Sequence, residues 1–386
     1  MKRKKWRKYI IIGLGVIGVG VCFMVFAQSA AQVVPVAIVE KKNIVYPRQY
    51  SDTHITKNAK MTDKQLNNLA KIKKESFLAS AASSLSTNSP ASEVSQPEKG
   101  TWLWTPTLGL TSIYRDSIIA GAKRNGIRNF YLSLDSYLDI YVLPDGPEKT
   151  TKKKAFDNAL ESFIVVAHKN NMTVDAEAGW RNWAEPGNEY KSIAIVDYVL
   201  EFNATHTEKL RGFQYDVEPY LLDSYPKNKS IVLGDFLNLI RRTITQLENS
   251  DIAFSVVIPD FYDSASGETP RFLYAWNYDY TLTHLLNILE RRPGSTILVM
   301  AYRNFSQGPD GAIAISQNEI QTANNYHTKI IVAQETGEIL PSYITFYNTS
   351  LSALNTQIKN IQETFASNKS YNGIAIHYIN ALMKLE

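Results

Sequence analysis

Two acidic residues, Asp216 and Glu218, stand one position apart in the segment 211–220, which reads RGFQYDVEPY. In a strand, successive side chains alternate between two faces, so both carboxyl groups would project to the same side. If that side is the mouth of a small barrel, shielding from water and mutual repulsion would push their two pKa values apart. One group could then stay protonated as an acid while the other stays charged. The alternative is a pair of solvated charges at the end of an ordinary strand.

The elements that would position this pair alternate between strand and helix from residue 100 to residue 386. Short apolar runs predict strands over residues 101–105, 129–136, 172–178, 212–218, 252–259, 296–302, 329–334 and 373–378. Helical patterns follow the first seven strands, over residues 112–125, 150–170, 188–204, 230–248, 277–291, 313–326 and 350–367. This alternation predicts an α/β fold, a (β/α)8 TIM barrel over residues 100–386, which matches the usual size of about 250 residues or more.

A doubly wound open sheet is the alternative fold. Such a sheet normally carries a glycine-rich phosphate loop after its first strand, and Trp104-Thr105-Pro106 is unlike one. The barrel has one weak point, because the chain ends eight residues after Tyr378 and leaves an eighth helix of at most two turns. We expect this gap to stay partly open or to be covered by a helix over residues 61–85.

The residues before the barrel predict an export signal and a spacer. Residues 1–8 are basic, and the run from Tyr9 to Ala27 carries no charge and is about long enough to span a bilayer as a helix. We predict a transmembrane helix or signal segment over 9–31, with the C-terminal domain outside the cell membrane, or secreted if the segment is cleaved. The uncleaved anchor is favoured, because no charge appears before Glu40. Residues 32–99 are interpreted as a stalk with a possible helix over 61–85.

Composition excludes several classes of function. The net charge is +4, but six positive charges lie in residues 2–8, so the remainder of the chain is weakly acidic and no nucleic-acid partner is expected. Cys22 is the single cysteine and lies in the apolar run, so the exported domain has neither a disulfide nor a cysteine nucleophile. The six histidines are scattered and no G-x-S-x-G elbow occurs. We therefore predict neither a metal nor a cofactor.

Acidic and aromatic residues recur at the predicted strand ends, where the chemistry of such a barrel is located. Aromatic faces stack on sugar rings, and carboxylates bind hydroxyl groups and transfer protons. Besides Asp216 and Glu218, the candidate substrate-binding residues are Trp104, Asp135, Tyr137, Glu177, Trp180, Tyr262, Tyr302, Arg303 and Tyr378.

Each candidate also has a plainer interpretation. A tryptophan at a strand start is often part of the core, and Asp135 could cap a turn or pair with an arginine. His377, a single imidazole at the last strand end, more often supports a site than acts as a base. Arg303 could pair with Asp216 or Glu218 and lower its pKa, which would be wrong for an acid that must be protonated near neutral pH.

Two motifs resemble those of family 18 glycoside hydrolases, the chitinase-like barrels. GFQYDVE over residues 212–218 resembles the family's fourth-strand signature D-G-x-D-x-D-x-E, and Met300-Ala301-Tyr302 resembles its sixth-strand M-x-Y-D. The resemblance implies that Glu218 protonates the leaving oxygen, and that Asp216 and Tyr302 orient an acetamido group of the substrate. Three acidic positions of the two motifs are occupied by Arg211, Gln214 and Arg303 in this chain.

A second resemblance gives Glu218 the same role. Val217-Glu218-Pro219 is similar to the N-E-P acid/base motif on the fourth strand of the large retaining clan of barrel glycosidases. This resemblance implies that Glu335, at the end of the seventh strand, is the nucleophile. That mechanism needs two carboxyl groups about 5–5.5 Å apart.

Three functions remain open at this point. The first is a monomeric, membrane-anchored glycoside hydrolase that acts on a cell-envelope or matrix polysaccharide, with Glu218 as acid and Asp216 or Glu335 as its partner. The second is a surface barrel that has lost catalysis and binds glycan. The third is a structural envelope protein whose stalk matters more than its barrel.

Overall fold

The computed structural model describes residues 98–263 and 269–386. The predicted membrane or signal segment 9–31, the helix 61–85 and all but the last two residues of the stalk lie outside the described residues. Within the two described ranges, no helix is both long enough and apolar enough to cross a membrane.

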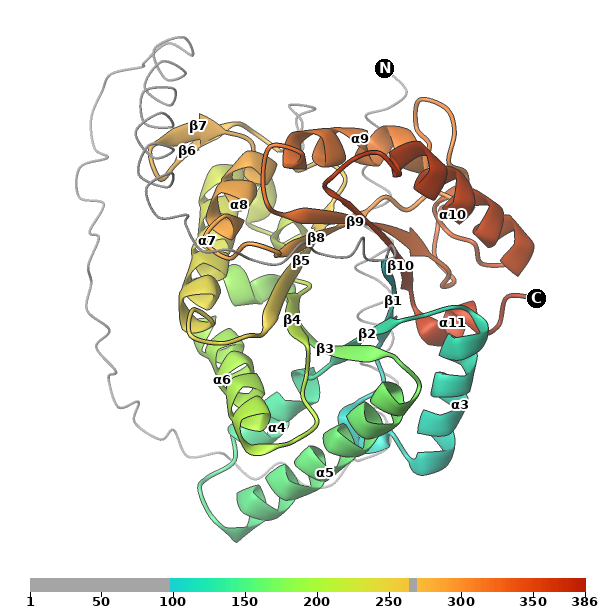
Figure 1. The fold of residues 1–386 in the computed structure, drawn as a ribbon. Coiled ribbons are helices and arrows are strands. Elements are labelled where there is room, and N and C mark those ends of the chain that lie inside the picture. Colours follow the sequence, from blue (N-terminus) through green and yellow to red (C-terminus); the bar gives the residue numbers. More distant parts are fainter. Residues whose placement is uncertain (1–97, 264–268) are drawn as a thin grey trace, which may run out of the picture.

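Eight parallel strands close into a barrel, in the order β1-β10-β9-β8-β5-β4-β3-β2. The predicted (β/α)8 fold is thus confirmed, and Figure 1 shows the strands ringed by helices. The barrel strands are β1 (Glu98–Leu103), β2 (Asn129–Ser133), β3 (Thr173–Ala178), β4 (Gly212–Tyr215), β5 (Ala253–Pro259), β8 (Thr296–Met300), β9 (Lys329–Glu335) and β10 (Tyr371–His377). The helices are α3 (Ser112–Arg124), α4 (Leu138–Tyr141), α5 (Pro147–Lys169), α6 (Glu189–Thr205), α7 (Tyr225–Gln246), α8 (Thr281–Leu289), α9 (Ala312–Ala323), α10 (Leu351–Phe365) and α11 (Ile379–Leu382).

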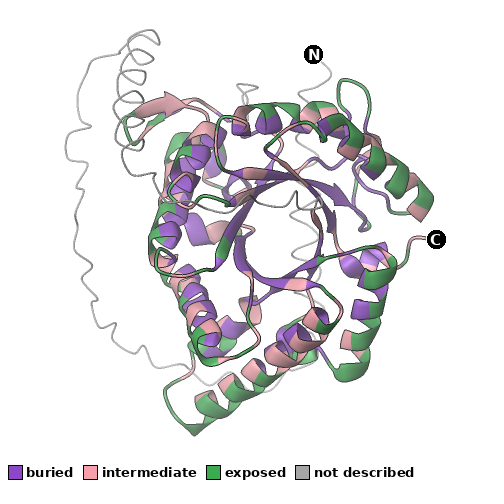
Figure 2. Ribbon diagram, viewed as in Figure 1, coloured by how far each residue is buried: buried purple, intermediate pink, exposed green. Residues whose placement is uncertain are grey.

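The strands are buried on both faces, as Figure 2 shows. On the outer face, Phe130, Phe213 and Tyr215 pack in the apolar layer beneath the helices. Local signals fix the helix starts: Pro147 opens α5, and the Ser350 hydroxyl accepts the Ala353 N–H at the start of α10. The inner face is filled by side chains, so the barrel is a packed core. That inner cluster includes Trp102, Tyr131, Val257, Leu298, Ile331 and Ala375.

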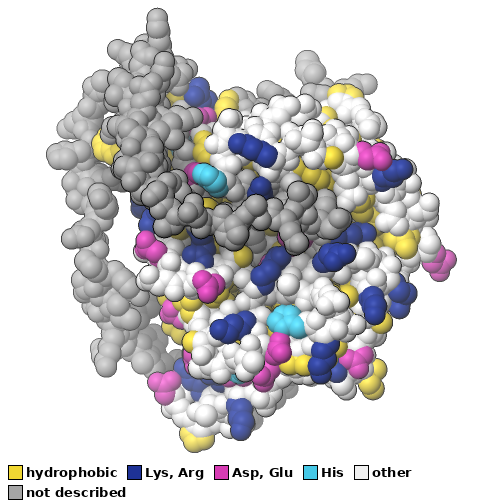
Figure 3. All heavy atoms as spheres, viewed as in Figure 1, with side chains coloured by type: hydrophobic (Ala, Val, Ile, Leu, Met, Phe, Trp, Pro, Cys, Tyr) yellow, Lys and Arg dark blue, Asp and Glu magenta, His cyan; other side chains and the backbone are white. Residues whose placement is uncertain are grey.

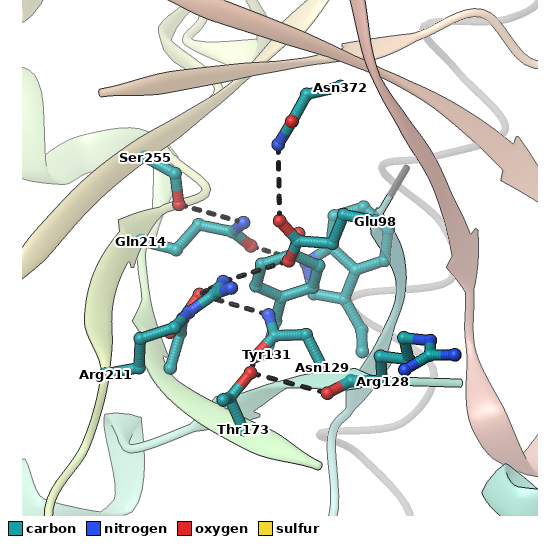
Figure 4. A network of polar contacts seen from close by, with 11 residues as sticks. Glu98, Arg128, Asn129, Tyr131, Thr173, Arg211, Gln214, Ser255 and Asn372 are labelled. Atoms are coloured by element: carbon teal, nitrogen blue, oxygen red, sulfur yellow. Dashed lines mark hydrogen bonds and ion pairs between the residues drawn. The ribbon is translucent and has the colours of Figure 1, made fainter. Parts of the chain in front are cut away.

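The strand starts are joined by a buried polar network, shown in Figure 4. Arg211 donates to Asp175 (Nε–Oδ1, 2.8 Å) and to Glu98 (Nη2–Oε1, 2.9 Å). One layer higher, Gln214 accepts the Trp102 indole N–H at 2.8 Å and donates to the Ser255 hydroxyl at 3.3 Å. Two departures from the family 18 motif, Arg211 and Gln214, therefore hold the barrel interior together.

Three elements differ from the prediction. The fourth strand ends at Tyr215 and not at residue 218, so Asp216 and Glu218 stand on the loop after it. A hairpin of β6 (Phe272–Tyr274) and β7 (Asn277–Asp279) occupies the start of the predicted helix 277–291.

The third difference is at the gap left by the short eighth helix. It is filled by α11 and the chain end, between α10 and α3 (Figure 1). The side chain of Met383 fits against Gly121, where an added Cβ would lie 2.4 Å from its sulfur. The chain end is tied to α10, because the Glu386 carbonyl accepts the Leu351 N–H at 2.9 Å.

Candidate active site

Four carboxyl groups gather at the C-terminal ends of β2, β3 and β4. Glu177 is the last inward-facing residue of β3, and Asp135, Asp216 and Glu218 stand on the loops that follow β2 and β4. Parts of these three loop residues reach the surface, but dense protein surrounds their carboxyl groups. The mutual electrostatic effects of the four groups link Glu177 to Asp135 and Asp216, and Asp216 to Glu218.

Burial raises the pKa of every member of this cluster. It raises the pKa of Asp135 to about 7 and that of Asp216 to about 6. Burial and the neighbouring Asp216 raise the pKa of Glu218 to about 8, and burial with two acidic neighbours raises the pKa of Glu177 well above its usual range. At neutral pH, therefore, Glu218 holds a proton while Asp216 beside it is mostly ionised.

A glycine brings the strand ends this close together. An added Cβ at Gly179 would lie 2.2 Å from the backbone oxygen of Asp216. The Gly179 N–H also donates to Asp135 Oδ1 at 3.3 Å, and the Asp216 N–H donates to the Ala178 carbonyl at 3.2 Å. The close crossing of these two loops thus sets the spacing of Asp135 and Asp216.

Glu218 is supported from behind by aromatic residues. The hydroxyl of Tyr220 donates to Glu218 Oε1. The ring of Tyr220 is held edge-on by Phe261, with centroids 5.2 Å apart, and by Tyr262 at 6.3 Å. One oxygen of Asp216, Oδ1, is buried and has no hydrogen-bond partner among the described residues. The carboxyl of Glu218 is thus fixed in place, while Asp216 keeps an acceptor free.

The other side of the mouth is formed by β1, β8, β9 and β10. Glu335 Oε2 accepts a hydrogen bond from His377 Nδ1 at 2.7 Å, and Trp104 Nε1 donates to His377 Nε2 at 2.9 Å. The ring of Tyr302 stacks on His377 at 6.2 Å, and that of Tyr378 meets it edge-on at 5.1 Å. His377 also acts electrostatically on Asp216 and Glu218, so both walls belong to one site.

Most of the predicted site residues come together in this mouth. These are Trp104, Asp135, Glu177, Asp216, Glu218, Tyr302, Glu335 and Tyr378. Trp180 stands on the loop after β3, 41% exposed, with the guanidinium of Arg181 over its ring at 5.6 Å. Arg181 in turn acts on Glu218, which places this loop at the edge of the same site.

Three predicted substrate-binding residues do not face the mouth: Tyr137, Tyr262 and Arg303. Tyr137 leaves the strand in a 3-10 turn and stacks on Tyr198 at 4.0 Å, within the apolar layer under α5 and α6. Tyr262 is buried behind Tyr220 and packs against Phe236 of α7.

Arg303 points away from the carboxyl cluster. It donates to Asp310 Oδ1 at 3.0 Å and lies 3.9 Å from Asp260. The expectation that Arg303 could pair with Glu218 or Asp216 is therefore wrong, and no contact with it lowers the pKa of either group.

His377 occupies the supporting position that the sequence indicates, and it joins Glu335, Trp104 and Tyr302. Tyr220, which fixes Glu218, is a site residue that the sequence prediction lacks; its place two residues after the acid is the one available signal. In the described part of the chain, no group of histidine, cysteine and acidic residues could hold a metal ion.

Comparisons with known proteins find similar solved structures alone. No family model and no curated protein matches the chain. The structure is similar to a GH18 chitinase from Pseudoalteromonas aurantia, with 13% identity, a TM-score of 0.46, and coverage of 73% of this chain and 93% of that one. It is also similar to an endo-1,4-beta-mannanase from Rhizomucor miehei, with 11% identity, a TM-score of 0.49, and coverage of 76% and 89%.

A third similar structure has another activity. It is a D-psicose 3-epimerase from Clostridium cellulolyticum H10, with 12% identity, a TM-score of 0.40, and coverage of 73% and 84%. Glycoside hydrolase barrels, one of family 18 among them, are thus among the structures to which this chain is similar. At these values the likeness says nothing about the reaction, which must be inferred from the site.

Proposed function

We propose that the protein is a glycoside hydrolase of the cell surface that cleaves a cell-envelope or matrix polysaccharide. One observation carries the proposal: the carboxyl groups of Glu218 and Asp216 lie together in the barrel mouth, where burial and Asp216 raise the pKa of Glu218 to about 8 and burial raises that of Asp216 to about 6. Glu218 protonates the leaving oxygen of the glycosidic bond. Asp216, one oxygen of which has no hydrogen-bond partner among the described residues, is the partner carboxylate beside the sugar that loses the glycosidic oxygen.

The surface around the mouth fits a sugar polymer. Every exposed large apolar side chain of the described residues lies on a segment that follows a barrel strand, the β6–β7 hairpin included, or in the first two turns of the next helix. These are Leu108, Ile113, Tyr141, Val142, Trp180, Tyr190, Ile231, Leu273, Trp276, Leu340 and Tyr347. The opposite end of the barrel has none of them, so the apolar contacts a long ligand needs are available on the side of Glu218.

Surface charge and cellular location are the remaining parts of the proposal. On the face seen in Figure 3, lysine and arginine side chains are interspersed with acidic ones, which fits a neutral polymer better than a nucleic acid. We propose that the apolar segment 9–31 anchors the chain in the cell membrane and that the barrel acts outside it as a monomer.

The test is a screen of the full chain against purified cell-wall and matrix glycans, with both binding and the release of reducing ends measured. We expect release from at least one glycan, and Glu218→Gln should abolish release while binding stays largely intact. If the wild-type chain binds a glycan and releases nothing, the barrel is a glycan-binding protein instead. The polar substitution Gln214 in the motif is the observation that keeps this second function open.

A further inference from the structure

Glu335, His377 and Trp104 form a linear chain of hydrogen bonds across the ends of β9, β10 and β1. Glu335 is 1% exposed, and both of its oxygens are occupied. Oε1 accepts the Gly337 N–H at 2.5 Å and Oε2 accepts from His377 Nδ1 at 2.7 Å. At the far side of the ring, His377 Nε2 meets Trp104 Nε1 at 2.9 Å.

This chain fixes where the protons are. An indole nitrogen can only donate, so the contact with Trp104 requires a lone pair on His377 Nε2. The single ring proton must then be on Nδ1, where it is donated to Glu335. A carboxylate that accepts two N–H groups is held in one orientation. Neither oxygen of Glu335 is free to attack a sugar carbon.

We infer that Glu335 and His377 are positioning residues. Glu335 selects the tautomer of His377, and His377 fixes the plane of the Trp104 indole, which forms the wall on which a sugar ring stacks. Only the statement that a sugar ring stacks on Trp104 rests on the proposed function. The hydrogen-bond chain itself is a property of the protein without any ligand. It also leaves Asp216 as the carboxylate that works with Glu218, in place of Glu335.

The arrangement depends on pH. The rings of Trp102, Trp104, Tyr302 and Tyr378 surround His377, and the charged groups that face it are Glu335, Asp216 and Glu218. Burial alone would lower the pKa of His377, but Glu335 and the two acidic residues outweigh it and raise the pKa. A proton on Nε2 would point at the indole N–H. The bond to Trp104 is therefore lost as the pH falls through the pKa of His377.

The test follows the indole N–H signals of the full chain by NMR with 15N-labelled tryptophan. The signal of Trp104 is assigned by its loss in Trp104→Phe. We expect a hydrogen-bonded position at high pH and a shift toward the unbonded position as the pH falls. His377→Gln should keep the bonded position at every pH, because its amide can donate to Glu335 and accept from Trp104. His377→Leu should give the unbonded position throughout. Trp180 is the matched control, and its signal should not respond.

Kinetics with a glycan cleaved in the screen separates positioning from catalysis. We expect Glu335→Gln to raise KM about tenfold, the cost of about one hydrogen bond, with kcat changed less than threefold. A Trp104 signal that is the same in the wild type and in His377→Leu would overturn the inference. So would a loss of kcat of a thousandfold or more in Glu335→Gln at unchanged KM. The NMR result holds or fails whether or not any glycan is cleaved, so it is independent of the proposed function.

Discussion

We predict that the substitution Glu218→Gln stabilises the protein relative to the wild type. This gain in unfolding free energy should grow as the pH rises. Burial and Asp216 raise the pKa of Glu218 from 4.5 to about 8. Between these two values the folded protein binds a proton that the unfolded chain has released. Stability therefore falls as the pH rises through this window. Glutamine carries no such charge, and its amide oxygen can still accept the hydrogen bond from Tyr220.

The size of the effect follows from the shift. One pKa unit corresponds to about 1.4 kcal/mol, so the whole shift amounts to about 5 kcal/mol above pH 8. At pH 7 the folded carboxyl is still mostly protonated and the cost is about 3 kcal/mol, against about 1 kcal/mol at pH 5. The variant should thus gain about 2 kcal/mol of unfolding free energy over the wild type between pH 5 and pH 7.

Urea unfolding at several pH values, followed by tryptophan fluorescence, measures this difference. Glu248→Gln is the matched control, because Glu248 is exposed after α7 and is not part of the carboxyl cluster. A difference between Glu218→Gln and the wild type that stays constant from pH 5 to pH 8 would show that Glu218 is not held protonated. The assignment of the acid would then fail.

Three further predictions concern the pH profile, the loop crossing and the polar network at the strand starts. The rate of glycan cleavage should rise with pH through about 6, as Asp216 ionises, and fall through about 8, as Glu218 loses its proton; a rate that keeps rising to pH 9 would contradict this. Gly179→Ala should cost about 3 kcal/mol in urea unfolding and lower activity, because its Cβ would meet the backbone of Asp216, and an unchanged midpoint would refute the close crossing. Arg211→Met should cost about 3 kcal/mol near neutral pH and less at pH 4, because burial raises the pKa of its partner Glu98 and that carboxyl then takes up a proton, and a cost independent of pH would count against the ion network.

The barrel could be predicted from the sequence because its signals are local. Each strand is a short apolar run, each helix has its own periodic pattern, and eight repeats leave few alternative folds. The pairing of Asp216 and Glu218 could also be predicted, because neighbouring residues on one segment reach the same mouth.

Predictions failed where the chain leaves the strands. The alternation of side chains holds only while a strand continues, and the chain enters a 3-10 turn at Asp135 that carries Tyr137 into the outer core. Arg303 pairs with Asp310, seven residues later in the sequence, and not with the carboxyl cluster. In the sequence prediction, only the cluster is considered as a partner for Arg303.

The importance of His377 was beyond local reasoning. Its partners are 42 and 273 positions away in the sequence, and only the closure of the barrel brings β10 between β9 and β1.

The central claim is that Glu218 delivers a proton to the leaving group of a glycoside. The most direct measurement compares Glu218→Gln with the wild type on the natural glycan and on a dinitrophenyl glycoside of the same sugar, whose leaving group needs no proton. We predict a loss of at least a hundredfold on the glycan and a much smaller loss on the dinitrophenyl glycoside. Equal losses on both substrates, or full activity of the variant on the glycan, would contradict the account.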